Sequence, residues 1–287
     1  MSDELSRRVR DYIKDIPSLP TSVFKVLEIC DNVQTSPADL NHVISLDPVL
    51  VGRVLKLLNS AYYGLNHQVT SLVRAIIMLG INTVKNLALS TAIIGNLPAG
   101  KESDGLDMEG FWRHSLCVGV AAKLLAEKRG IDFKQREEYF TAGLLHDIGK
   151  IPLNAVLKQE YMNAVNMADV ERISLVRAEV RSLGIDHCAA GAMIADSWRL
   201  QGAVGDTITM HHSYAEYDGP CKDILFSVAA ANRFAIAAEI GFAGDMYVEK
   251  PDPMIWEYLG LSHDILDEIE PAVNREIEKA KVFLMLQ

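Results

Sequence analysis

Residues 144–150 read Leu-Leu-His-Asp-Ile-Gly-Lys, so an adjacent histidine and aspartate close an apolar segment just before a glycine. Neighbouring side chains inside a helix point about 100° apart. At a helix end, where Gly149 lets the chain turn, His146 and Asp147 can both be brought onto one ion. Gly143, one turn earlier, is small, so another helix could approach closely there. The stretch therefore favours a metal-binding pair beside a tightly packed helix.

Histidines elsewhere in the second half of the chain fall at positions that could complete such a site. His114 lies in the apolar stripe of a predicted helix, where a lone buried histidine bonded to a backbone carbonyl is the simpler interpretation. His187 begins another predicted helix, and His211 and His212 form an adjacent pair later in the chain. Imidazoles and a carboxylate together suit iron, manganese, zinc or nickel better than calcium. The pattern predicts one or two divalent transition metal ions, with a purely structural histidine cluster as the alternative.

Helix signals dominate the chain, and no clear run of alternating apolar and polar residues suggests a strand. Ser36-Pro37 and Asp47-Pro48 are strong helix starts, because a capping side chain precedes a proline that fits the first turn. In the second half we expect helices over residues 108–129, 134–146, 155–183 (as a pair), from about 186, around 211, and over 221–240. The sequence therefore predicts an all-α fold.

One segment, residues 98–107 (PAGKESDGLD), differs in character from its surroundings. It contains a proline, two glycines and charges of both signs, which is typical of a linker. A second breaker, Pro251-Asp252-Pro253, cannot lie inside a helix because its prolines are so close together. The predicted division is an N-terminal helical part over 1–97, a linker over 98–107, a helical bundle over 108–250 and a C-terminal helical extension over 251–287.

The C-terminal tail over residues 262–286 is amphipathic. Pro271 interrupts its pattern and predicts an early bend or a restart of the helix. We expect the apolar face of the tail to pack back on the bundle, since burial within one chain is the commoner fate of such a stripe. A homodimer contact is the alternative.

Composition limits the classes of partner. The 287 residues include 28 Lys plus Arg and 38 Asp plus Glu, which gives a net charge of −10 and argues against binding a nucleic-acid backbone. A small phosphate ligand stays open, because a bound cation can reverse the local sign of the charge. Nearly half of the residues (49%) are hydrophobic, which excludes intrinsic disorder. The four cysteines form no CxxC pair and are expected to be reduced core thiols.

The N-terminal segment, residues 2–15, is charged throughout and lacks the apolar core of a signal peptide. The most apolar stretches fall far short of the roughly 20 residues that a membrane span needs. We therefore expect a cytoplasmic protein without a membrane partner.

Several motifs in fixed order carry a resemblance to a known family. The N-terminal part contains four of these motifs: Ile16-Pro17-Ser18-Leu19-Pro20, Ile44-Ser45-Leu46-Asp47-Pro48, Leu58-Asn59-Ser60-Ala61-Tyr62-Tyr63-Gly64 and Ala75-Ile76-Ile77-Met78-Leu79-Gly80. With the histidine motifs they resemble the HDOD family (HD-related output domain) of the HD phosphohydrolase superfamily. The resemblance implies a small N-terminal helical subdomain packed on an HD-like helical bundle. It also implies a regulatory or output module of bacterial signal transduction, often with a degenerate HD site.

The resemblance also assigns roles to individual residues. The six residues that match metal-ligand positions of the related HD-GYP phosphodiesterases, which open cyclic di-GMP, are His114, His146, Asp147, His187, His211 and His212. Lys150 matches a lysine that lies near the substrate phosphate there. If hydrolysis occurs, Asp147 and Lys150 are the expected catalytic residues, with Lys150 offsetting negative charge on the phosphate.

Two departures from the superfamily pattern weaken the prediction of catalysis. Asn232 stands where an aspartate ligand is expected, and it offers a carbonyl oxygen without a negative charge. Ser213-Tyr214 replace the glutamate expected after His212. The leading hypothesis is a regulatory module that acts by binding a signalling protein, a cyclic dinucleotide or a phosphate ligand. The alternative is a metal-dependent phosphodiesterase acting on a cyclic dinucleotide or nucleotide.

Overall fold

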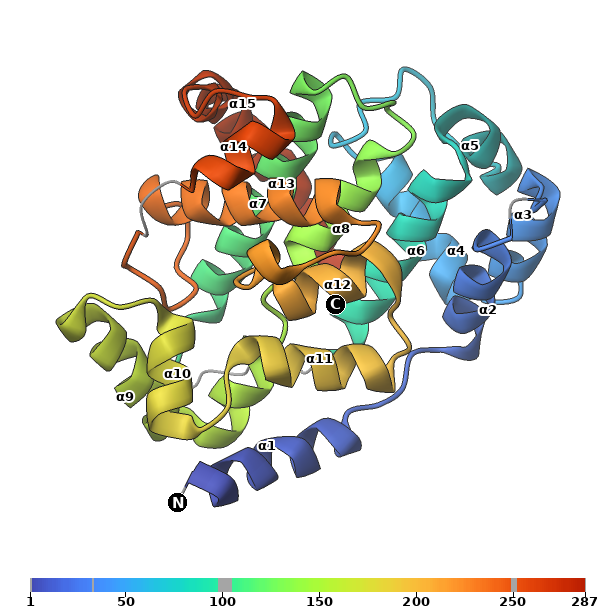
Figure 1. Cartoon of the computed structure of the whole chain (residues 1–287). Coiled ribbons are helices and arrows are strands. Elements are labelled where there is room, and N and C mark those ends of the chain that lie inside the picture. Colours follow the sequence, from blue (N-terminus) through green and yellow to red (C-terminus); the bar gives the residue numbers. More distant parts are fainter. Residues whose placement is uncertain (1, 33, 98–104, 249–251, 287) are drawn as a thin grey trace.

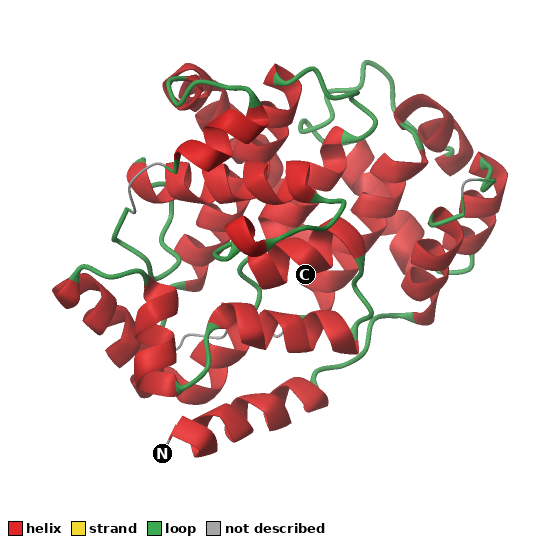
Figure 2. Ribbon diagram, in the orientation of Figure 1, coloured by secondary structure: helices red, strands yellow, loops and turns green. Residues whose placement is uncertain are grey.

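The computed structural model describes residues 2–32, 34–97, 105–248 and 252–286. Every regular element in these ranges is a helix, and none of the described residues lies in a strand (Figure 2). The predicted all-α fold is confirmed. Most of the expected linker, residues 98–104, and Pro251 of the second breaker lie outside the described residues.

The helices fall into a group before the linker and a group after it, and the second group contains the two longest helices of the described residues, with 21 and 22 residues (Figure 1). The first group consists of α1 (Ser2–Asp15), α2 (Thr21–Cys30), α3 (Pro37–Ser45), α4 (Pro48–Leu58), α5 (Leu72–Leu79) and α6 (Ile81–Asn96). The second group consists of α7 (Met108–Lys128), α8 (Arg136–Leu145), α9 (Lys150–Glu171), α10 (Leu175–Leu183), α11 (His187–Ser197), α12 (Gly202–Met210), the 3-10 turn η1 (Tyr214–Glu216), α13 (Lys222–Ala237), α14 (Pro253–Leu259), α15 (Ile265–Ala280) and the 3-10 turn η2 (Lys281–Leu286).

Side-chain caps explain several of these starts. Ser36 accepts a hydrogen bond from the backbone N–H of Asp39, whose carboxylate accepts one in return from the N–H of Ser36. The Asp47 side chain accepts from the N–H of Leu50 at the start of α4. Each cap satisfies an N–H group that lacks a partner inside its helix, which is worth about 1 kcal/mol. The two helix starts predicted at Ser36 and Asp47 are confirmed.

Helices of the first group pack on helices of the second group at two places. Helices α2 to α6 pack on one another, and α6 packs on α8 of the second group. Helix α1 instead lies along α9 and α11 at the lower edge of the molecule in Figure 1. The indole N–H of Trp198, at the end of α11, donates to the carbonyl of Pro17 and fixes the chain between α1 and α2. The predicted domain boundaries stay a prediction.

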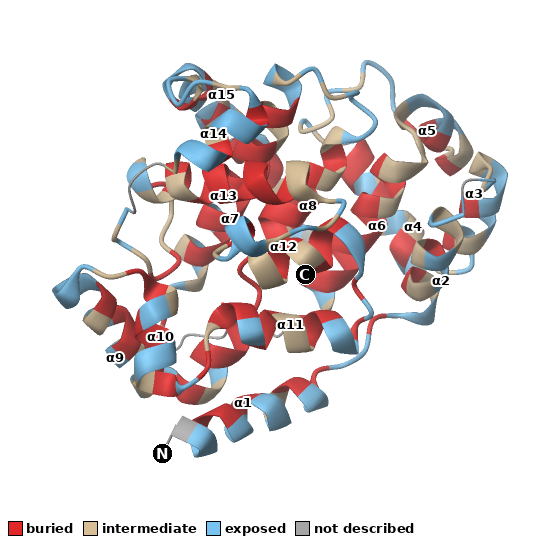
Figure 3. Cartoon of the chain, viewed as in Figure 1, coloured by how far each residue is buried: buried red, intermediate tan, exposed pale blue. Residues whose placement is uncertain are grey.

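Helices α7, α8 and α13 form the buried centre of the molecule (Figure 3). Helices α7 and α8 approach closely because glycines meet at their crossing. A Cβ atom on Gly143 would lie 2.8 Å from the Cα of Gly119, and one on Gly119 would lie 2.8 Å from the carbonyl oxygen of Phe140. Both distances are too short for real carbon atoms, so the crossing requires glycine on each helix. The close approach expected at Gly143 is confirmed.

The tail packs back on the bundle, as predicted. Helix α15 lies along α7 and buries Ile269, Val273 and Ile277. It continues through Pro271, so the expected restart of the helix is wrong, and the expected bend stays a prediction. The following turn places the Phe283 ring against the rings of Tyr62 and Phe140, with centroids 5.4 and 4.8 Å apart.

Tyr62, from the Leu58–Gly64 motif, also belongs to a buried polar contact between the two groups of helices. The ammonium of Lys123 on α7 donates to the Tyr62 hydroxyl at 3.0 Å and to the Glu137 carboxylate on α8 at 2.7 Å. The carboxylate and the hydroxyl compensate the charge of a lysine that burial would otherwise destabilise. The motif therefore joins the N-terminal part to the two central helices.

Two predicted helix boundaries are wrong near the histidines. Helix α9 begins at Lys150, directly after the His-Asp pair, and not near residue 155. Helix α12 ends at Met210, so His211 caps the helix and is not surrounded by it. Both changes place candidate site residues at helix ends, where the backbone can direct them inward.

No single helix within the described ranges is long and apolar enough to cross a membrane. Helices α5 and α6 taken together are long and apolar enough for a membrane span, but the chain bends by 118° between them.

Candidate metal centre

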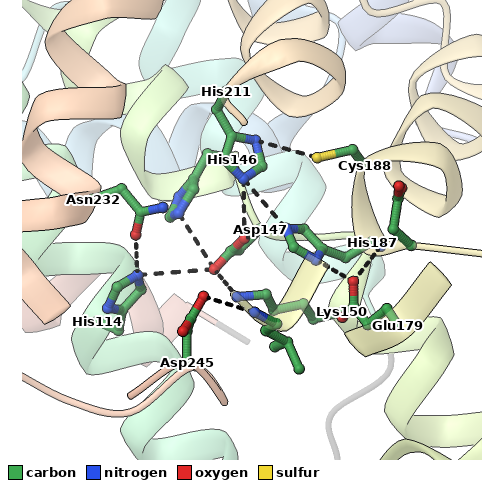
Figure 4. Close-up of polar contacts among 12 residues, drawn as sticks. His114, His146, Asp147, Lys150, Glu179, His187, Cys188, His211, Asn232 and Asp245 are labelled. Carbon is green, nitrogen blue, oxygen red and sulfur yellow. Dashed lines mark hydrogen bonds and ion pairs between the residues drawn. The ribbon is translucent and has the colours of Figure 1, made fainter. Parts of the chain in front are cut away.

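The predicted histidines converge from separate helices on one buried aspartate (Figure 4). Asp147 lies in the turn between α8 and α9 and is fully buried. The surrounding residues are also buried; they are His114 on α7, His146 after α8, Lys150 at the start of α9, His187 at the start of α11, His211 after α12 and Asn232 on α13. Residues up to 118 positions apart in the sequence therefore meet at one point.

The two carboxylate oxygens of Asp147 face different groups. Oδ2 lies 2.7 Å from the Lys150 ammonium, 3.3 Å from His146 Nε2 and 3.8 Å from His114 Nε2. Oδ1 lies 3.4 Å from His187 Nε2 and 3.5 Å from His211 Nε2. Burial alone would raise the pKa of Asp147, but His146 and Lys150 hold it well below its usual value. The group is a carboxylate with basic side chains on both sides.

Three of the imidazoles are oriented by their other ring nitrogen. Nδ1 of His146 donates to the carbonyl of Gly143 at 2.7 Å, and Nδ1 of His211 donates to the carbonyl of Thr207 at 3.0 Å. Nδ1 of His187 donates to the Glu179 carboxylate at 2.6 Å. A neutral imidazole has one protonated nitrogen, so each of these rings, in its neutral form, presents the lone pair of Nε2 toward Asp147.

This orientation directs electron pairs at one another. His146 Nε2 and Asp147 Oδ1 are buried and form no hydrogen bond with any residue that the structure describes. The Nε2 atoms of His187 and His211 are 3.3 Å apart, which also brings two lone pairs together. Such contacts are unfavourable unless a cation lies among them. Imidazole nitrogens and a carboxylate are suitable ligands for a divalent transition metal, so the residues fit the expected metal.

When metal is absent, a proton on an imidazole can supply part of the positive charge that these atoms need. Burial would lower the pKa of His211, but the Cys188 sulfur and Asp147 raise it to about 9. Burial lowers the pKa of His114 to about 3, in spite of the nearby Asp147, so that ring is neutral. Metal binding would therefore displace protons from some ligands and find others already neutral.

Asn232 and His212 lie at the edge of the group. The Oδ1 atom of Asn232 accepts from His114 Nε2 at 3.0 Å, so it shares the His114 side of the site. The His212 ring packs on His211 and His187, with centroids 4.3 and 5.0 Å away. His212 is partly exposed and stands outside the set of nitrogens that face Asp147. The ligand roles predicted for these residues stay predictions.

Sequence reasoning missed two residues of the site. Glu179 on α10 is fully buried and accepts from both Nδ1 and the backbone N–H of His187. The sequence does contain a sign of this role: Glu179 is a charged residue on the apolar face of its helix, one turn from both Leu175 and Leu183. Cys188 follows His187 directly, and its Sγ lies 3.8 Å from His211 Nδ1.

The site is nearly closed. A recess of about 30 Å³ leads to it, between Arg233, Tyr247 and the two histidines His211 and His212. A volume of this size accommodates about two water molecules. A metal ion and small ligands fit in this arrangement, whereas a dinucleotide requires the lining to move.

Comparison with known sequences gives one family and one curated relative. The sequence profile of the HDOD domain matches residues 16–214. An uncharacterized protein from Treponema pallidum (strain Nichols) is 26% identical over 231 residues, which are 80% of this chain and 44% of the relative. The chain thus spans less than half the length of that relative.

Several solved structures are similar. An HDOD domain protein with unknown function from Geobacter sulfurreducens has a TM-score of 0.74 and 26% identity, over 96% of each chain. A suggested signal transduction protein from Marinobacter aquaeolei VT8 has a TM-score of 0.73 and 21% identity, over 100% of this chain and 66% of that one. A suggested phosphohydrolase from Shewanella amazonensis SB2B has a TM-score of 0.69 and 22% identity, over 96% and 98%. The last two, at such identities, support the fold alone.

Proposed function

Since this chain belongs to the HDOD domain family, we propose that it is a regulatory module of signal transduction that retains an HD-type metal centre. In this proposal the module acts by binding a ligand or a protein partner, and hydrolysis is weak or absent. The metal is a divalent transition ion held by His114, His146, Asp147, His187 and His211.

The observation that carries the metal centre is the arrangement of lone pairs around Asp147. The Nε2 atom of His146 and the Oδ1 atom of Asp147 are buried without a hydrogen bond to any described residue. Leaving a buried polar atom unpaired costs about 1–3 kcal/mol. A structural histidine cluster would use hydrogen-bond donors to satisfy these atoms. Their orientation toward a shared point instead supports a bound cation.

Two features support binding over hydrolysis. Asn232 supplies no negative charge on the His114 side, where the nearby carboxylate oxygen is Asp147 Oδ2, 3.8 Å from His114 Nε2. A cyclic dinucleotide also enters the recess of about 30 Å³ only if the lining moves. Phosphoryl transfer needs strong electrostatic stabilisation of a bound substrate. A site with reduced charge and little space is better suited to holding an ion and a small ligand.

The alternative function is a metal-dependent phosphohydrolase, which is what has been suggested for the similar Shewanella protein. A bound metal would polarise a phosphoryl oxygen and acidify a water molecule. Lys150 would contribute its ammonium, which is 2.7 Å from Asp147 Oδ2, to offset charge on the phosphate. Asp147 would orient Lys150 and the imidazoles.

Elemental analysis of freshly purified protein tests the metal centre. We expect about one or two equivalents of iron, manganese, zinc or nickel, and a lower melting temperature after chelation, because a ligand that binds only the folded state stabilises it. The control is heat denaturation of chelated protein after the metal is restored, which should recover the original temperature. Metal below one tenth of an equivalent, with no effect of added metal on melting, would contradict the proposal.

The Asn232→Asp variant separates the two functions. The added carboxylate should tighten metal binding, and in a site with reduced charge it should create or raise hydrolysis of cyclic di-GMP by at least about tenfold. The measurement is product formation by metal-loaded wild type and variant at equal metal content. Substantial turnover by the wild type, unchanged in the variant, would favour the enzyme over the binding module.

Glu179→Gln tests the support of the His187 ligand. Gln can still accept a hydrogen bond from His187 Nδ1, but it lacks the charge that strengthens the imidazole as a ligand, so metal affinity should fall about 10- to 100-fold. Competition with a chromophoric chelator measures this change. Glu171→Gln at the end of α9 is the matched control, because this carboxylate is exposed and pairs only with Arg181 among the described side chains. Equal affinities for both variants would rule out the supporting role of Glu179.

A further inference from the structure

We propose that Cys188 is a thiolate ligand of the metal centre, on the side of His187 and His211, and that it gives this side a preference for zinc or another thiophilic ion. The inference rests on the proposed metal centre and adds a residue to it. It concerns which metal the site holds, and so which metal the module responds to.

The first observation is the proximity of three donors. One nitrogen of His187, one nitrogen of His211 and the Cys188 sulfur all lie within 4.8 Å of one another, and all three residues are buried. The two Nε2 atoms lie 3.3 Å apart, and the sulfur lies 3.8 Å from Nδ1 of His211, the ring nitrogen that donates to Thr207. Donors around one tetrahedral zinc ion lie roughly 3.3–3.8 Å apart, given bond lengths of about 2.0–2.3 Å. The limit of 4.8 Å puts the three donors within about 1 Å of that spacing.

The second observation is the orphaned oxygen of Asp147. Oδ1 is buried, accepts no hydrogen bond from the described residues, and points at His187 and His211, 3.4 and 3.5 Å away. It therefore supplies a further donor toward His187 and His211. Two imidazoles, a thiolate and a carboxylate are ligands of the kinds that zinc prefers.

Charge is the third consideration. Asn232 adds no negative charge to that of Asp147, and Lys150 already compensates much of the Asp147 charge through the contact at 2.7 Å. The Glu179 carboxylate is paired with Nδ1 of His187 at 2.6 Å, on the far side of that ring from Nε2. A divalent ion buried among neutral imidazoles needs further negative charge. A Cys188 thiolate, formed when its proton leaves to solvent on binding, supplies one negative charge. Cys188 thus compensates for the carboxylate that Asn232 does not provide.

The two sides of the centre then differ in chemical character. His114, His146, Asp147 Oδ2 and the amide oxygen of Asn232 offer only nitrogen and oxygen. The side of His187 adds sulfur, and soft thiolate ligands select zinc over manganese and other hard ions. We expect the His187 side to set the metal preference.

Cobalt substitution tests this assignment. Chelated protein reconstituted with Co²⁺ should show intense near-ultraviolet absorption from charge transfer between thiolate and cobalt, and Cys188→Ser should abolish it while retaining bound cobalt. Cys188→Ser should also lower zinc affinity by at least about tenfold, since even the loss of an outer partner costs 10- to 100-fold, and should change manganese affinity much less. Cys221→Ser is the matched control and should keep the absorption.

The outcomes distinguish this inference from the proposed function. Cobalt bound by the wild type without the charge-transfer absorption, or absorption that persists in Cys188→Ser, would overturn the role of Cys188 and leave the metal centre standing. If the wild type binds no cobalt, zinc or manganese, both proposals fail. X-ray absorption of the zinc-loaded wild type decides the matter if the variant does not fold: a zinc–sulfur distance near about 2.3 Å is expected, and a shell of nitrogen and oxygen alone contradicts the assignment.

Discussion

Replacing Gly149 with alanine is expected to destabilise the protein by about 3 kcal/mol, at the upper end of the usual effect of overpacking. A Cβ atom at this position would collide with the carbonyl oxygen of His187 and lie 2.5 Å from the backbone nitrogen of Gly191. Both atoms belong to the backbone of α11 and cannot move aside by changing a rotamer. Helix α11 must therefore shift away from the turn that carries Asp147.

Gly149→Ala should lose metal binding as well as stability. Helix α11 carries His187, whose Nε2 lies 3.4 Å from Asp147 Oδ1, so a shift of this helix separates the two halves of the proposed metal centre. Chemical denaturation measures the change in unfolding free energy, and elemental analysis measures the remaining metal. The control is Gly52→Ala in α4, where a Cβ atom meets nothing within 4 Å. That variant should be neutral or stabilised by up to about 1 kcal/mol. If Gly149→Ala behaved like Gly52→Ala, the close crossing of α11 would be disproved.

Gly149 also shows where sequence reasoning stops. The motif predicts a glycine that lets the chain turn after His146 and Asp147. Its φ angle is −66°, which any residue adopts, so the turn does not require glycine. The requirement comes from α11, which lies 38 residues later in the chain and whose position no local pattern could give. The residue was identified correctly, and the physical reason for it was wrong.

Local signals were sufficient for the helices themselves. Capping residues such as Ser36 and Asp47 act through their own neighbours, and the apolar stripe that buries Val273 and Ile277 acts through helical periodicity. The path of α15 through Pro271 could not be predicted, because packing on α7 compensates for the hydrogen bond that proline lacks. Tertiary contacts override local preference at such positions.

The residues of the candidate site also fall into those that local sequence could predict and those that depend on tertiary contacts. Histidines at helix ends could be found from the sequence, because few other roles explain several of them at such positions. Glu179 and Cys188 could not be assigned to the site, since their importance depends on the meeting of α10 and α11 with the turn after α12. The orientation of each imidazole also depends on carbonyl groups, such as that of Thr207, which carry no sequence signal.

Replacing Asp147 with asparagine is the second change with a large expected effect. Asp147 is fully buried, and it is the partner of the buried Lys150 ammonium at 2.7 Å. Removing one member of a buried ion pair leaves the other charge uncompensated and costs about 3–5 kcal/mol. The variant also loses the negative charge of the carboxylate that four imidazoles surround. Its metal content should therefore fall below about one tenth of the wild-type value.

A double-mutant cycle with Lys150→Met separates the two effects. Lys150→Met alone leaves the Asp147 charge without its closest partner, and should cost stability comparable to that lost in Asp147→Asn. The double variant removes both charges, so its loss of unfolding free energy should be smaller than the sum of the single losses by about 2–3 kcal/mol. Metal binding should not return, because the carboxylate is still absent. Additive losses in chelated protein, or a full complement of metal in Asp147→Asn, would show that Asp147 is not the centre of this site.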